Sequence, residues 1–176
     1  MEAGGWMKNL VLIGMPGTGK SVVGKVLAQR LNYSFVDVDD LIVEAAGKTL
    51  PDILRTDGLA AFLEIEEQVG KTLSLEDSVI ATGGSMVLSH AAMTHLKENG
   101  LNVWLETPLS KISDRMPDDL IDRGIAAPAG MTIREIYQQR QPLYAQYADL
   151  IVVSQEDLVG TAVKVEEMMR TVGVTL

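Results

Sequence analysis

The chain has 176 residues, of which 47% are hydrophobic and 22% are charged, and its 24 acidic and 15 basic residues give a formal net charge of −9. This composition is typical of one folded domain and excludes intrinsic disorder, and the acidic balance argues against nucleic acid or an anionic membrane as a partner. The absence of cysteine excludes disulfide scaffolds, thiolate metal sites and cysteine nucleophiles.

Residues 1–6 are interpreted as a short extension before the first element. No apolar run near the start has the length of a signal peptide, and the longest apolar runs of the chain are as short as strands. We therefore expect a cytoplasmic protein.

Short apolar runs alternate with longer segments of helical periodicity along the chain. The runs have the length of buried strands: Asn9–Ile13, Ser34–Val38, Ser78–Thr82, Leu101–Leu105 and Asp149–Val153. The predicted helices lie between and after them: Gly19–Leu31, Asp39–Ala46, Leu50–Leu73 with a break near Asp57, Ser89–Glu98, Pro108–Arg115, Thr132–Tyr147 and Glu156–Arg170. This alternation predicts one α/β domain over residues 1–176, with a mostly parallel sheet covered on both faces.

The segment after the first predicted strand, Gly14–Ser21, matches the phosphate-binding pattern G-x-x-x-x-G-K-[ST] at every position. Its glycines allow backbone N–H groups to surround phosphate oxygens, and the following helix adds the positive end of its dipole. A chance match has a probability of about 0.6% in a chain of this length. The residues expected to contact the nucleotide are Pro16, Gly17, Thr18, Gly19, Lys20, Ser21 and Val22.

Two aspartates lie at the end of the second predicted strand, in the segment FVDVD. Because alternate residues of a strand share a side, we expect Asp37 and Asp39 to face the same way and to serve one metal ion and one hydroxyl. The competing interpretation is a helix N-cap at Asp39 or Asp40, of which Asp40 is the better candidate. No N-K-x-D guanine motif is present, so a small GTPase is not expected.

Four motifs, GMPGTGKS, VDVD, ATGGS and RQPLY, resemble those of the shikimate kinase family over about residues 9–169. The resemblance implies a three-layer αβα P-loop kinase fold with a five-stranded parallel sheet and a helical lid. The acceptor-binding helical region would span about residues 39–73, and the lid about residues 116–130. The implied reaction is the transfer of a phosphoryl group from ATP, with Mg²⁺, to the 3-hydroxyl of shikimate.

The resemblance also implies roles for particular residues. Lys20 and Ser21 would hold phosphate and Mg²⁺, and Asp37 would help to position the metal. Asp39 would orient or deprotonate the attacking hydroxyl, and the catalytic residues would be Lys20, Asp39 and Arg123. Arg115 would stack near the adenine. The acceptor would be bound by four residues: Asp39, Gly83, Gly84 and Arg140.

The lid segment has about 15 residues without a clear period, and loops of this length in compact domains are usually functional or disordered. Its Arg123 is a candidate cation for the transition state. The alternative is a solvated arginine that balances nearby carboxylates. Those carboxylates are Asp118, Asp119 and Asp122.

The sequence departs from the family pattern where the acceptor and the lid are expected. Leu63 stands where the family has an arginine for the acceptor carboxylate, and the glycine triplet ends in Ser85. The lid has Arg-Gly-Ile-Ala over residues 123–126 in place of the usual Arg-Pro-Leu-Leu, whereas Glu66 keeps its expected place. Arg55 is a candidate replacement for the missing guanidinium.

Two alternatives to shikimate phosphorylation therefore stay open. The chain could phosphorylate a different hydroxylated metabolite, or it could bind nucleotide without kinase activity. The expected partner is a small-molecule acceptor, with neither nucleic acid nor a membrane as a partner, and a monomer is expected.

Overall fold

Five parallel strands form one sheet in the computed structural model, which describes residues 8–174. The strands are β1 (Asn9–Ile13), β2 (Ser34–Asp37), β3 (Ser78–Ala81), β4 (Leu101–Glu106) and β5 (Leu150–Val153). Their spatial order is β2-β3-β1-β4-β5, and every neighbouring pair is parallel. The predicted α/β class and five-stranded sheet are confirmed, and each predicted strand agrees to within one residue at either end. The proposed extension, residues 1–6, lies outside the described residues.

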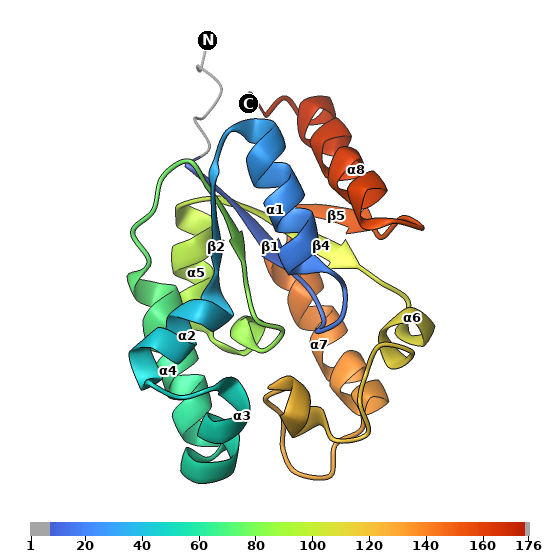
Figure 1. Ribbon diagram of the computed structural model, residues 1–176. Helices are drawn as coiled ribbons and strands as arrows, with labels where there is room; N and C mark the ends of the chain where they lie inside the picture. Colours follow the sequence, from blue (N-terminus) through green and yellow to red (C-terminus); the bar gives the residue numbers. More distant parts are fainter. Residues whose placement is uncertain (1–7, 175–176) are drawn as a thin grey trace.

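Helices cover both faces of the sheet, as predicted (Figure 1). The α-helices are α1 (Lys20–Leu31), α2 (Val38–Ala46), α3 (Leu50–Asp52), α4 (Leu59–Thr72), α5 (His90–Glu98), α6 (Leu109–Ser113), α7 (Ile133–Tyr147) and α8 (Leu158–Thr171). The remaining turns are a π-helical turn, η1 (Ile53–Asp57), and two 3₁₀ turns, η2 (Met86–Leu88) and η3 (Leu120–Arg123). No described helix has the length and apolar character that a membrane crossing requires.

The alternation of side chains along the central strand β1 divides the core in two. Leu10 and Leu12 pack on one face with residues of α1 and α8, whereas Val11 and Ile13 pack on the other with residues of α4, α5 and α7. All four side chains are buried, which explains why the strand is apolar throughout. The sheet is therefore the middle layer of three.

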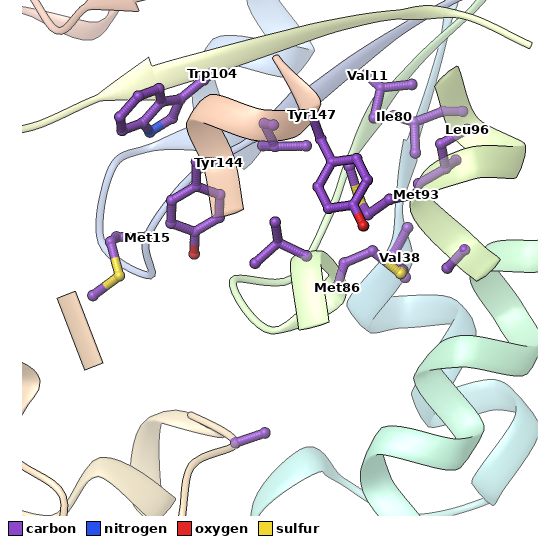
Figure 2. Close-up of a cluster of buried hydrophobic side chains, with 14 of the residues drawn as sticks. Val11, Met15, Val38, Ile80, Met86, Met93, Leu96, Trp104, Tyr144 and Tyr147 are labelled. Carbon is purple, nitrogen blue, oxygen red and sulfur yellow. The ribbon is translucent and has the colours of Figure 1, made fainter. Parts of the chain in front are cut away.

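Figure 2 shows the second of these cores, where aromatic side chains of α7 meet the sheet. The Trp104 and Tyr144 rings lie 5.9 Å apart between centroids. The buried Tyr144 hydroxyl donates to the backbone carbonyl of Gly84 at 2.6 Å. This contact fixes the loop after β3 against α7 and thereby positions one wall of the site.

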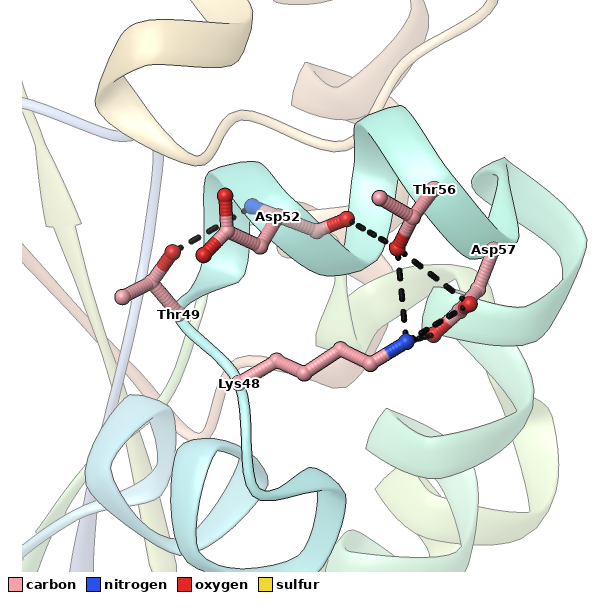
Figure 3. Close-up of polar contacts among 5 residues, drawn as sticks. All are labelled: Lys48, Thr49, Asp52, Thr56 and Asp57. Carbon is pink, nitrogen blue, oxygen red and sulfur yellow. Dashed lines mark hydrogen bonds and ion pairs between the residues drawn. The ribbon is translucent and has the colours of Figure 1, made fainter.

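The predicted helix over residues 50–73 is broken near Asp57, as expected, but the break is a π-helical turn. The Gly58 N–H donates to the carbonyl of Ile53, five residues back, and Gly58 has a φ of 90°. Thr49 caps the preceding short helix, and Lys48 binds Asp57 (Figure 3). These contacts hold a compact corner over residues 48–57.

Candidate active site

The phosphate loop joins β1 to α1, and its backbone N–H groups remain available to a ligand. Gly17 and Gly19 have φ values of 81° and 87°, which glycine adopts without strain. Gly19 is the N-cap of α1 and provides no side-chain cap, so the helix N-terminus is open to an anion. The loop therefore has the form that binds phosphate oxygens.

Lys20 is buried within this loop. Its ammonium group donates to the carbonyls of Gly14 and Met15, both at 2.8 Å. Burial lowers the pKa of Lys20 to about 8, although Asp39 and Asp37 act in the opposite direction. The lysine is thus a desolvated cation. A bound phosphate could take the place of the two carbonyls that accept its hydrogen bonds.

Ser21 and Asp37 form a hydroxyl–carboxylate pair at the start of α1. The Ser21 hydroxyl donates to Asp37 Oδ2 at 2.6 Å, and Asp37 Oδ1 accepts from the backbone N–H of Asp39 at 3.0 Å. Asp37 is therefore the N-cap of α2, so the competing interpretation, a cap at Asp39 or Asp40, is wrong. Asp39 lies in the first turn of that helix, and the strand alternation used to pair it with Asp37 does not apply.

The oxygen atoms of Ser21 and Asp37 fit a magnesium ion that is held jointly with a nucleotide. Mg²⁺ prefers hard oxygen ligands and keeps water and substrate phosphates in its coordination shell. Within residues 8–174, no cluster of three or more His, Asp or Glu side chains could hold a metal by itself. Such a site would depend on phosphate oxygens to complete the coordination.

A cavity of about 240 Å³ extends from the phosphate loop to α7. The predicted site residues that line it are Pro16, Gly17, Gly19, Lys20, Ser21, Val22, Asp37, Asp39, Gly83, Gly84, Arg123 and Arg140. Two predicted residues lie outside the lining. Thr18 is buried within the loop, and Arg115 is exposed and donates to the carbonyl of Gly17 at 2.6 Å.

Arg140 of α7 is a buried residue of the cavity lining. It is 1% exposed, and its Nη2 donates to the carbonyl of Ala126 in the lid. Nε and Nη1 are buried without a partner among the described residues. Because unpaired buried donors are costly, the guanidinium is suited to an anionic group of a ligand.

Two carboxylates, Asp39 and Glu66, lie over Gly83. A Cβ atom at Gly83 would lie 2.8 Å from Glu66 Oε2 and 3.0 Å from Asp39 Oδ1, so no larger residue fits there without displacing a carboxylate. Burial and the neighbouring Asp37 raise the pKa of Asp39 to about 6. Burial also raises the pKa of Glu66 to about 7.

The sequence interpretation assigned no site role to several lining residues. Ser85 donates its hydroxyl to Glu66 Oε1 at 2.7 Å, which joins the loop after β3 to α4. The sequence signals were the altered glycine triplet and the expected place of Glu66, but neither shows that the two residues are in contact. Apolar and small residues complete the wall: Phe62, Thr82, Gly124, Ile125 and Ala126.

Leu63 and Arg55 both lie outside the cavity lining. Leu63 is half-buried and packs against the core. Arg55 binds Asp119, at 3.3 Å, and Asp122, which ties η1 to the lid. The structure thus places the Arg55 guanidinium on the lid, where it pairs with two of the carboxylates considered as partners of Arg123.

Comparison with known proteins gives one consistent result. Residues 16–172 match the shikimate kinase family. A shikimate kinase of Persephonella marina is 36% identical over 141 residues, covering 80% of this chain and 85% of that protein. A shikimate kinase of Synechococcus elongatus is 36% identical over 170 residues, covering 93% and 87%. The structure of shikimate kinase from Acinetobacter baumannii in complex with shikimate has a TM-score of 0.85 and 27% identity, covering 96% of both chains.

Proposed function

The chain belongs to the shikimate kinase family, and on this premise we propose that it transfers the γ-phosphoryl group of ATP to the 3-hydroxyl of shikimate. The observation that carries the proposal is one cavity in which a phosphate loop, a carboxylate and a buried guanidinium follow one another. This arrangement matches the three parts of the reaction: the nucleotide phosphates, the reacting hydroxyl and the acceptor carboxylate. The related structure with bound shikimate supports the choice of acceptor.

At the nucleotide end, the residues provide positioning and positive charge, which phosphoryl transfer chiefly requires. Lys20 would contact the β- and γ-phosphates, and Arg123 of the lid would approach the transferred group from the other side. Both side chains line the cavity, and the charge of Arg123 contributes to the lowered pKa of Lys20. Ser21 and Asp37 would hold Mg²⁺, which neutralises charge on the phosphate oxygens.

At the centre of the cavity, Asp39 would serve the attacking hydroxyl. Its pKa of about 6 leaves it mainly ionised at neutral pH, so it can accept a hydrogen bond or a proton. The backbone of Gly83 and Gly84 lies beside it in the lining. The hydroxyl would thereby be directed toward the phosphate loop.

At the far end, Arg140 would bind the carboxylate of shikimate through the nitrogens that have no protein partner. Leu63 does not line the cavity, so Arg140 is the cation that this end provides among the described residues. Its burial strengthens the interaction because water competes less for the charge. One guanidinium therefore takes the role for which the family pattern has two.

We further propose that the protein acts as a monomer in the cytoplasm, with a small molecule as its partner. The residues expected to bind the nucleotide and the acceptor line the same cavity of this chain. The net charge of −9 disfavours nucleic acid and anionic membranes. Light scattering would report a mass close to 19.1 kDa for this state.

The test of the catalytic assignment is shikimate-dependent ADP release by the unaltered chain and by Asp39→Asn. Loss of the carboxylate should lower kcat by about 10²- to 10⁴-fold, since general-base groups contribute on this order. Asp40→Asn is the matched control, because Asp40 is exposed, lies on the same helical turn and does not line the cavity. ADP release that is equal with and without shikimate would contradict the proposal.

A further inference from the structure

The hydroxyl of Tyr144 is a buried donor that contacts the site from behind. Tyr144 belongs to α7, is 1% exposed and does not line the cavity. Its hydroxyl donates to the backbone carbonyl of Gly84, which does line the cavity. Burial raises the pKa of Tyr144 above its ordinary value of 10.0, with Arg140 acting in the opposite direction, so the hydroxyl keeps its hydrogen at neutral pH. No step of the proposed reaction uses this hydrogen bond directly.

Gly84, which accepts this hydrogen bond, lies directly against the phosphate loop. A Cβ atom at Gly84 would lie 2.6 Å from Cδ and 3.1 Å from the backbone nitrogen of Pro16. Pro16 belongs to the nucleotide-binding motif, whereas Gly84 belongs to the loop after β3. A displacement of Gly84 would therefore change the spacing between the two loops.

The ring of Tyr144 lies toward the other end of the phosphate loop. It packs against the Trp104 ring of β4, which is tilted by 31° and lies 5.9 Å away between centroids. Trp104 Cδ1 is in turn 3.6 Å from an ideal Cβ position at Gly14, the first residue of the phosphate motif. Figure 2 shows the Tyr144 hydroxyl directed away from the indole. One side chain thus links the start of the phosphate loop to the loop after β3.

The spacing of these loops matters because phosphoryl transfer depends on position. The attacking hydroxyl must lie in line with the transferred group, and a misplacement of about 1 Å can slow a reaction about 100-fold. Arg140 precedes Tyr144 by four residues on α7, so both lie on the same face of that helix. The helix that provides the buried guanidinium therefore also holds Gly84 in place.

We propose that Tyr144 is a positioning residue for phosphoryl transfer that acts through Gly84. Resting on the proposed function, the inference is that this hydrogen bond sets the distance between the loop after β3 and the phosphate loop. It thereby sets the approach of the acceptor hydroxyl to the γ-phosphoryl group. The tyrosine hydroxyl itself touches neither substrate, so its removal slows the transfer more than it weakens binding.

The test is steady-state kinetics of Tyr144→Phe, which removes one oxygen atom and keeps the ring that packs on Trp104. We expect kcat with shikimate to fall by about 10- to 100-fold, with KM for shikimate and for MgATP within about twofold. ADP release in the absence of shikimate should stay within about twofold, because the phosphate loop keeps its contacts. The kinetics are measured at a temperature at which circular dichroism shows every variant to be fully folded.

Tyr147→Phe is the matched control on the same helix. Its hydroxyl lies 2.8 Å from Nδ1 of His90, and neither residue lines the catalytic cavity, so this variant should keep the kcat of the unaltered chain. An equal kcat in the two variants, or an effect of Tyr144→Phe confined to KM, would overturn the positioning role while leaving shikimate phosphorylation intact. Absence of shikimate turnover by the unaltered chain would instead overturn both proposals.

Discussion

Glu66 carries a titratable group whose environment differs strongly between the folded and unfolded chain. Burial raises its pKa from the ordinary value of 4.5 to about 7, with Asp39 acting in the same direction and Ser85 and Arg140 opposing. The folded state therefore binds this proton more tightly than the unfolded state. The stability that Glu66 contributes is present below pH 4.5 and is lost as the pH rises through 7.

Replacement of Glu66 by glutamine should therefore stabilise the protein in a pH-dependent way. At pH 8, where the buried carboxylate is ionised, Glu66→Gln should raise the free energy of unfolding by about 1–3 kcal/mol. At pH 5 the two chains should be nearly equal, because the native glutamate is already protonated. Urea unfolding at pH 5 and at pH 8 measures the free energy of unfolding of both chains. An equal effect of Glu66→Gln at the two pH values would show that ionisation of buried Glu66 does not destabilise the fold.

At the scale of single residues, the sequence predicts the site best where one motif contains all the contacts. Lys20 and Ser21 belong to one contiguous motif, Gly14–Ser21, and both line the cavity. The cap at Asp37 was missed because α2 begins one residue earlier than predicted. The contact of Ser85 with Glu66 joins residues 19 apart on separate elements, so no local pattern contains it.

The predicted lid segment contains the 3₁₀ turn η3 and contacts both η1 and α3. Arg55 of η1 binds Asp119 and Asp122, and a Cβ atom at Gly124 would lie 2.8 Å from Cβ of Leu50 in α3. The segment thus rests on the corner formed by η1 and α3 (Figure 1). We propose that this segment, when held there, excludes water from the transferred phosphoryl group and limits hydrolysis of ATP.

Replacement of Arg55 by alanine should loosen the lid. We expect KM for shikimate to rise by about two- to fivefold, a small change because the ion pairs are exposed to solvent. ADP release in the absence of acceptor should rise in parallel. Lys48→Ala is the matched control, because Lys48 binds Asp57 in the same corner without contacting the lid (Figure 3). If Arg55→Ala and Lys48→Ala have the same KM for shikimate and the same ADP release without acceptor, the Arg55 ion pairs do not hold the lid in place.

Whole elements are predicted from the sequence more reliably than the turns between them. Apart from the broken helix over residues 50–73, the predicted helices agree with the structure to within two residues at each end. The exception is η1, since a π-helical turn arises from one shifted hydrogen bond to Ile53 and has no periodicity of its own. The lid was predicted to be irregular, but it contains the short turn η3. Arg55, which binds Asp119 beside this turn, lies 64 residues earlier in the chain, so no local pattern contains the contact.

The whole molecule combines a net charge of −9 with a cavity that gathers positive groups. Lys20, Arg123 and Arg140 all line the cavity, although they come from the start of α1, from η3 and from α7. The local field at the phosphate loop, and not the net charge, governs nucleotide binding. The strand order β2-β3-β1-β4-β5, which brings these segments together, is a property of the fold that no local pattern specifies.

Nucleotide binding should accordingly stabilise the whole fold. With MgATP at about 100 times its Kd, the midpoint of thermal unfolding should rise by about 5–10 °C. Lys20→Ala should lose most of this shift, whereas Lys25→Ala should keep it, because Lys25 is exposed on α1 outside the cavity. A shift of the same size in the unaltered chain, Lys20→Ala and Lys25→Ala would show that MgATP binds outside the phosphate loop.

In the proposed reaction, the cavity binds ATP and shikimate together and the γ-phosphoryl group passes from one to the other in a single step. Phosphorus NMR of the unaltered chain with MgATP and shikimate tests this claim directly, because it identifies the product. Equal amounts of ADP and of a single phosphomonoester, shikimate phosphorylated at the 3-position, are expected. Formation of ADP and inorganic phosphate alone, or no consumption of ATP, would contradict it.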